Sequence, residues 1–118
     1  MSYNPRVEEL ERTCRRIETK AVELKVLSYT VAANVSIAAG VSSASVSIPK
    51  ASLPADFNKD NVLNINVQYA TANGIGFIVT SFAVNGSGNL VVQVTTANKN
   101  DSSQSIKPTI KVLYTVAL

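Results

Sequence analysis

The chain has 118 residues, a formal net charge of +3, one cysteine, no tryptophan and no histidine. A single cysteine excludes a disulfide within the chain, and the lack of histidine excludes Ser-His-Asp triads and histidine zinc sites. The small positive excess forms no basic stripe with interleaved aromatic residues, so we expect no nucleic-acid partner. The N-terminus has no apolar signal region, and no stretch approaches the roughly 18 apolar residues of a membrane span. We therefore expect no membrane partner and synthesis in a cytoplasm.

Residues 7–24 predict an N-terminal amphipathic helix that forms a coiled coil. Apolar or small side chains recur there at spacings of 3, 4, 3, 4 and 3, and nearly all positions between them are charged or polar. This oligomerisation seam consists of Val7, Leu10, Cys14, Ile17, Ala21 and Leu24. A seam this narrow is typical of a helix that packs against partner helices. We expect a helical stalk over residues 1–25 and a separate β-domain over residues 26–118.

The seam does not determine how many helices associate or whether the partner is the chain's own β-domain. It does not distinguish a trimer from a dimer, because its positions include small residues such as Cys14, which we expect to be a buried hydrophobe. The alternative is that the helix packs on its own β-domain, with Val22 and Val26 widening the apolar stripe. Core-facing helices usually show a wider stripe than this one, which favours self-association. Isolated helices of this length are marginal in water, so the β-domain should share in the assembly.

From Val26 onward the hydrophobic period changes to two, which predicts strands. The first predicted strand is long and covers residues 27–37. The second covers residues 44–48 and ends at Pro49, and a loop over residues 50–61 follows it. The third covers residues 63–69, and its inward side chains are Leu63, Ile65, Val67 and Tyr69.

Three further strands complete the predicted fold. Residues 75–84 are apolar on both faces, with Phe77 and Val79 on one and Ile78, Phe82 and Val84 on the other, which predicts a central strand or one covered by a neighbouring subunit. Strands over residues 90–95 and 110–116 are separated by a polar loop over residues 97–105, and Pro108 suits a strand end or an edge. The pattern predicts a mainly β chain: an N-terminal coiled-coil helix followed by a six-stranded antiparallel β-sandwich or small barrel.

Few residues offer chemistry. Asp56, Asn58 and Asp60 have the spacing that opens a calcium loop, but the glycine and the later bidentate glutamate of such loops are missing. We interpret these side chains as turn caps. The glycine-rich turns over residues 74–76 and 86–88 lack the helix and the lysine of a phosphate-binding loop. We expect no catalytic residue, no metal and no cofactor, and hence no enzyme.

A short coiled coil that passes directly into a compact β-domain rich in Ser, Thr, Asn and Val resembles the trimeric fibre, decoration and knob proteins of tailed bacteriophages. The features that carry the resemblance are the heptads from Val7 to Leu24, the switch from helix to strand near Val26, and hairpins at Asn73-Gly74 and Asn85-Gly86. The likeness is one of architecture and transfers no functional residue. It implies a homotrimer on a virion, assembled in the host cytoplasm. Its partners would be other virion proteins of the capsid or tail, and a host-surface glycan or protein.

The leading interpretation is a non-enzymatic virion structural protein, a homotrimeric head fibre or capsid decoration knob used for attachment or host-surface binding. The alternative is a carbohydrate- or protein-binding adaptor whose helix is a docking segment and whose loops, with Phe57, contact the ligand. A hydrolase or transferase is disfavoured, because the three aspartates of the β-domain all lie in loops and form no acid/base pair.

Overall fold

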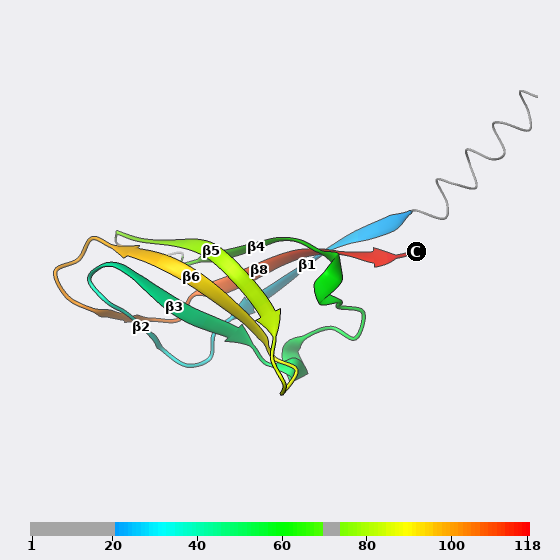
Figure 1. The fold of residues 1–118 in the computed structure, drawn as a ribbon, viewed down its shortest axis with the longest axis horizontal. Coiled ribbons are helices and arrows are strands. Elements are labelled where there is room, and N and C mark those ends of the chain that lie inside the picture. Colours follow the sequence, from blue (N-terminus) through cyan, green and yellow to red (C-terminus); the bar gives the residue numbers. More distant parts are fainter. Residues whose placement is uncertain (1–20, 70–73) are drawn as a thin grey trace, which may run out of the picture.

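The computed structural model describes residues 21–69 and 74–118, which contain eight strands and two short 3-10 turns (Figure 1). The strands before the gap at residues 70–73 are β1 (Val22–Thr30), β2 (Val35–Ile37), β3 (Gly40–Ile48) and β4 (Val62–Gln68). Those after it are β5 (Ile75–Val84), β6 (Leu90–Asn98), β7 (Gln104–Ile106) and β8 (Thr109–Ala117). The turns η1 (Lys50–Ser52) and η2 (Lys59–Asn61) lie between β3 and β4.

The strands form two three-stranded sheets and one two-stranded ladder, and every pair is antiparallel. The first sheet has the order β1-β8-β4, the second has the order β3-β6-β5, and β2 pairs with β7. The predicted mainly β, antiparallel class is confirmed. The six strands of the two larger sheets correspond to the six predicted ones, and β2 and β7 are additional.

The two larger sheets share one core, built on their central strands. Every second residue of β6 from Leu90 to Asn98 is buried, and so are Ile110, Val112 and Tyr114 of β8. Alternating β-branched residues suit this arrangement, because each strand presents one side to the opposite sheet. The buried core residues are Val46, Ile48, Ile65, Val67, Leu90, Val92, Val94, Ile110, Val112 and Tyr114.

The predicted strand over residues 27–37 is wrong as a single element. The chain leaves the first sheet after Thr30, and β2 pairs separately with β7, inside the region predicted to be a polar loop. Asn98 explains why this polar region is structured. Its side chain is buried, its amide nitrogen donates to the carbonyls of Ile37 and Ser102, and its amide oxygen accepts the backbone N–H of Asn100.

Pro108 lies directly before β8, which is the central strand of its sheet and not an edge. The strand-end position predicted for it is therefore right and the edge position is wrong. A proline there removes no ladder donor, because the ladder of β8 begins at Thr109. The carbonyl of Pro108 accepts the backbone N–H of Val31, which fixes the chain where it leaves β1.

A bulge in β5 corrects the prediction of a strand that is apolar on both faces. Pairing with β6 shifts by one residue between Val79 and Ser81, so Thr80 is an extra residue. Beyond the bulge, Phe82 and Val84 stand opposite the buried Val92 and Leu90 and face inward like Val79. The extra residue changes the phase of the alternation, so the apolar residues before and after the bulge lie on the same side of β5. The predicted central position is wrong, because β5 is an edge strand. Ile78, which is 69% exposed, is the large apolar side chain left outside.

A second bulge corrects the inward position predicted for Leu63. Pairing of β4 with β8 shifts between Val62 and Asn64, which leaves Leu63 unpaired and 59% exposed. Val62 takes its place against the core. Two other inward predictions in this strand, Ile65 and Val67, are confirmed as buried. The fourth, Tyr69, directly follows β4 and is half-buried.

The start of β1 corrects the C-terminal end of the predicted helix. Residues from Val22 onward pair with β8, so Leu24 belongs to a strand and not to a coiled-coil seam. Ala21 precedes the strand, and its carbonyl accepts the N–H of Leu118 at 3.4 Å. The remaining seam residues, Val7, Leu10, Cys14 and Ile17, lie outside the described residues. The hairpin predicted at Asn73-Gly74 is wrong, because the strands before and after it, β4 and β5, belong to different sheets. The hairpin predicted at Asn85-Gly86 is confirmed, because it joins the paired strands β5 and β6.

Candidate interaction surfaces

The outer side of β1 carries three neighbouring exposed apolar side chains. Val22, Leu24 and Val26 are 51%, 63% and 67% exposed, and we call them the β1 apolar face. They alternate with residues that point to the other side, such as Lys25 and the core-packed Leu27. Farther along the same side of β1 the residues are Ser28 and Thr30. The outer side of this strand is therefore apolar only in the half nearest the N-terminal segment.

The partner strand continues this surface. Val22, Leu24 and Val26 stand opposite Ala117, Thr115 and Leu113 of β8. Figure 1 shows this end of β1 and the C-terminal end of β8 projecting beyond the second sheet. Contiguous apolar surface of this kind, in contrast to a single exposed apolar residue, is typical of an interaction site.

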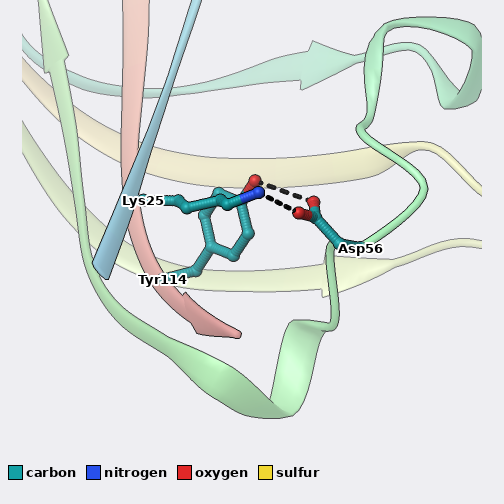
Figure 2. A network of polar contacts seen from close by, with 3 residues as sticks. All are labelled: Lys25, Asp56 and Tyr114. Carbon is teal, nitrogen blue, oxygen red and sulfur yellow. Dashed lines mark hydrogen bonds and ion pairs between the residues drawn. The ribbon is translucent and has the colours of Figure 1, made fainter. Parts of the chain in front are cut away.

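The opposite side of β1 holds the best-defined polar cluster, in which Lys25, Asp56 and Tyr114 point toward one another (Figure 2). The Lys25 ammonium donates to Asp56 Oδ2 at 2.5 Å, and the Tyr114 hydroxyl donates to Asp56 Oδ1 at 3.1 Å. The ring of Phe57 packs edge-on against that of Tyr114, with centroids 5.4 Å apart. These contacts fasten the loop between β3 and β4 to the first sheet.

The electrostatics of the cluster follow from this geometry. The hydrogen bond from Lys25 lowers the pKa of Asp56 below its ordinary 3.8, and the bond from Tyr114 acts in the same direction. The same contact with Asp56 raises the pKa of Lys25. Burial, and then the hydrogen bond to Asp56, raises the pKa of the Tyr114 hydroxyl. All three groups therefore keep their ordinary charge states at neutral pH, which suits an anchor.

Two of the three residues considered for a calcium loop, Asp56 and Asn58, have other roles in the structure. Both carboxylate oxygens of Asp56 accept hydrogen bonds from Lys25 and Tyr114. The side chain of Asn58 caps η2 by accepting the backbone N–H of Asp60 at 2.9 Å. The turn-capping interpretation is thus confirmed for Asn58, and Asp56 is an anchor for the loop.

An open hollow of about 470 Å³ lies between this loop and the β5–β6 hairpin, and we call it the loop–hairpin hollow. Leu53, Phe57 and Val84 give it an apolar surface, and Lys50 and Lys59 line it as well. Pro54, Ala55, Asn58 and Gly88 complete the lining. Its volume lies in the range of about 300–1,000 Å³ that small-ligand sites occupy.

The walls of this hollow are held by the backbone and by asparagine side chains. Asn85 Oδ1 accepts the N–H groups of Ser87 and Asn89, which closes the hairpin. Asn89 Oδ1 in turn accepts the N–H of Lys50, which joins the hairpin to η1. The hollow is therefore formed by segments that are tied both to each other and, through Asp56, to the first sheet.

A second open hollow, of about 450 Å³, separates the free edges of β4 and β5. Residues 62–65 and 79–82 line this hollow. The two bulged residues, Leu63 of β4 and Thr80 of β5, therefore both belong to its lining. Phe82 faces the core yet is 38% exposed, because it lines this open hollow. Bulges are common where a strand edge bends away from its neighbour.

The sequence placed the oligomerisation residues in the helix and named Phe57 among the loop residues of a ligand-binding adaptor, and Phe57 does line the loop–hairpin hollow. The β1 apolar face and the other residues of both hollows were missed. The β1 apolar face had a signal, since Val22, Leu24 and Val26 alternate with charged residues at a period of two. The other residues of the hollows had none, because the loop–hairpin hollow depends on which loops meet and the second hollow on how the edges of β4 and β5 lie beside each other. Within residues 21–69 and 74–118 no helix is long and apolar enough to cross a membrane.

No protein family, curated protein or solved structure matches this chain.

Proposed function

We propose that this protein is a non-enzymatic virion structural protein that assembles as a homotrimer, as a head fibre or capsid decoration knob does. The observation that carries the proposal is the β1 apolar face, which leaves Val22, Leu24 and Val26 more than half exposed in the single chain. Exposed apolar surface is unfavourable in water, and association lowers the free energy because it removes that surface from water. A second copy of the chain is the occupant that we infer.

The position of the face supports self-association. The predicted heptads over residues 7–17 end a few residues before Val22, so the apolar pattern predicted for the helix and that of the strand adjoin in the sequence. Parallel helices around one axis bring the beginnings of their β1 strands together. The β1 apolar faces would then continue the contact that the helices start, which a short coiled coil requires because it is marginal alone.

The location on a virion rests on architecture. The predicted order of helix and then strand, together with the antiparallel β-domain, is the feature that resembles phage fibre, decoration and knob proteins. The non-enzymatic role rests on residue chemistry. Asp56 is engaged with Lys25 and Tyr114, and the chain has no histidine to serve as a general base.

The experiment that tests the proposal is light scattering on the full-length chain over a dilution series. We expect a mass of three 12.5 kDa chains at the higher concentrations. Co-sedimentation with virus particles grown in the same host then tests the location. A mass of one chain at every concentration would contradict the proposal.

A carbohydrate- or protein-binding adaptor is the second candidate, and the loop–hairpin hollow favours it. This hollow has the size of a ligand site and walls that hydrogen bonds hold in place. An adaptor would remain a single chain in light scattering and would acquire its partner through this hollow.

A further inference from the structure

The loop–hairpin hollow combines an apolar interior with two cationic side chains. Leu53, Phe57 and Val84 form the apolar part and are each half-buried, so a ligand can still cover them. Lys50 and Lys59 are exposed and come from opposite ends of the loop between β3 and β4. The site therefore offers apolar contact and positive charge to the same ligand.

The two lysines are available for an external anion. In the described residues the loop's ion pair is Lys25 with Asp56, which neutralises that carboxylate. Neither Lys50 nor Lys59 makes an ion pair with the described residues. Asp60 is the other acid of the loop, and it does not line the hollow.

Lys50 is also positioned by its surroundings. Its backbone N–H donates to Asn89 Oδ1 at 3.0 Å. Its aliphatic stem lies against Gly88, where an added Cβ would come within 2.8 Å of Lys50 Cδ. Gly88 has a φ of +83°, a conformation that favours glycine, so the hairpin both turns and leaves room for the lysine here.

We propose that the loop–hairpin hollow binds an acidic peptide segment of a partner protein. An apolar side chain of the peptide would enter the hollow over Leu53, Phe57 and Val84, and flanking carboxylates would meet the ammonium groups of Lys50 and Lys59. This site does not depend on the proposed trimer, since all its residues come from one chain.

A peptide fits these walls better than a sugar. Sugar rings carry hydroxyl groups on all sides and need convergent hydrogen-bond partners, whereas the central lining here is aliphatic and aromatic. The side-chain oxygen of Asn58 is already used by the N–H of Asp60. Charge complementarity thus selects an acidic ligand, and the apolar interior selects one with a hydrophobic side chain.

The test is fluorescence anisotropy on the full-length protein with a labelled, end-blocked peptide in which one phenylalanine is flanked on each side by glutamates. Matched peptides carry glutamine for each glutamate, or serine for the phenylalanine. We expect the glutamate peptide to bind. The glutamine peptide should bind about two- to thirtyfold more weakly, since it loses two exposed ion pairs that each contribute up to about a fivefold change. The serine peptide should also bind more weakly, because it loses the burial of the phenylalanine ring. Failure of the glutamate peptide to bind would contradict the proposal.

Variants locate the binding. Lys50→Gln combined with Lys59→Gln should weaken binding by about two- to thirtyfold, the range for two exposed ion pairs. The control combines Lys107→Gln with Lys111→Gln, which removes two exposed lysines elsewhere, and should leave binding unchanged. Equal losses in both double variants would contradict the site.

A third variant tests the apolar part of the hollow. Ala55→Trp places a large side chain at an exposed lining position and should block the peptide without a change in thermal stability. Unchanged affinity in a folded Ala55→Trp protein would place the peptide elsewhere. An oligogalacturonate that binds more tightly than the glutamate peptide, and loses this binding in the Lys50 and Lys59 double variant, would contradict the peptide proposal and identify an acidic sugar as the ligand.

Discussion

The β1 apolar face makes a quantitative prediction about assembly. We consider Leu24→Ser combined with Val26→Ser, which changes two outward side chains and leaves the inward side of β1 intact. Full burial of one such side chain stabilises a structure by about 1.5–3 kcal/mol. Because these two are 63% and 67% exposed in the single chain, about 1–2 kcal/mol for each remains to be gained by association.

A trimer contains six of these side chains, so the double variant should lose about 6–12 kcal/mol of assembly free energy. Since 1.4 kcal/mol corresponds to a tenfold change, the dissociation constant should rise by at least about ten-thousandfold. The midpoint concentration of a trimer varies as the square root of that constant. It should therefore rise by about a hundredfold or more.

Light scattering over a dilution series measures this midpoint, and circular dichroism checks that the variant stays folded. Ile78→Ser is the matched control, because Ile78 is 69% exposed on the outer side of the other sheet. We expect the control to keep the midpoint of the unchanged protein. The reasoning is refuted if the double variant assembles normally, or if Ile78→Ser disrupts assembly equally.

Three further predictions concern the loop and the bulges. Because the pKa of Asp56 is lowered in the folded protein, its contribution to stability is complete above its unfolded pKa and is lost as the pH falls through the folded value. Thermal denaturation between about pH 2 and 7 should thus show a loss of stability below about pH 4, and Lys25→Met should make that loss smaller. Gly88→Ala, at a φ of +83°, should destabilise by about 1–2 kcal/mol in urea titrations, whereas Gly86→Ala, with open space around it, should change little. Deletion of Thr80 should leave a folded domain, because β5 then pairs with β6 without an extra residue, whereas deletion of Ala83 turns Val84 outward and should lower the melting temperature clearly more.

The alternation of apolar and polar residues predicted the central elements well. The predicted strands over residues 44–48, 63–69 and 90–95 all fall mostly within observed strands, and Val46, Ile48, Ile65 and Val67 point inward as expected. These positions are decided locally, since each strand has one side in the core and one outside it. The class of the fold follows from them.

The errors arise where one extra residue changes the phase of the inward and outward alternation, or where a contact distant in sequence determines the local structure. Thr80 is an ordinary residue in the sequence, and only pairing with β6 makes it a bulge that turns Phe82 inward. Asn98 looked like part of a polar loop, but its hydrogen bonds to Ile37 and Ser102 bury it. Leu24 fits both a heptad and a two-residue period, and its pairing with Thr115 of β8 decides for the strand.

The two proposed surfaces can be separated by experiment, because the β1 apolar face lies on the outer side of β1 and the loop–hairpin hollow is lined by no residue of that strand. Leu24 and Val26 face outward toward the inferred second copy, whereas Lys25 between them faces the loop whose far side forms the loop–hairpin hollow. Lys25→Met should loosen that loop and lower the affinity for the acidic peptide, while the midpoint concentration of the trimer stays unchanged. Leu24→Ser with Val26→Ser should do the reverse, because no hollow residue lies on β1. Measuring both anisotropy and mass on both variants checks this, and a parallel loss of both properties in either variant would mean that the surfaces are one site.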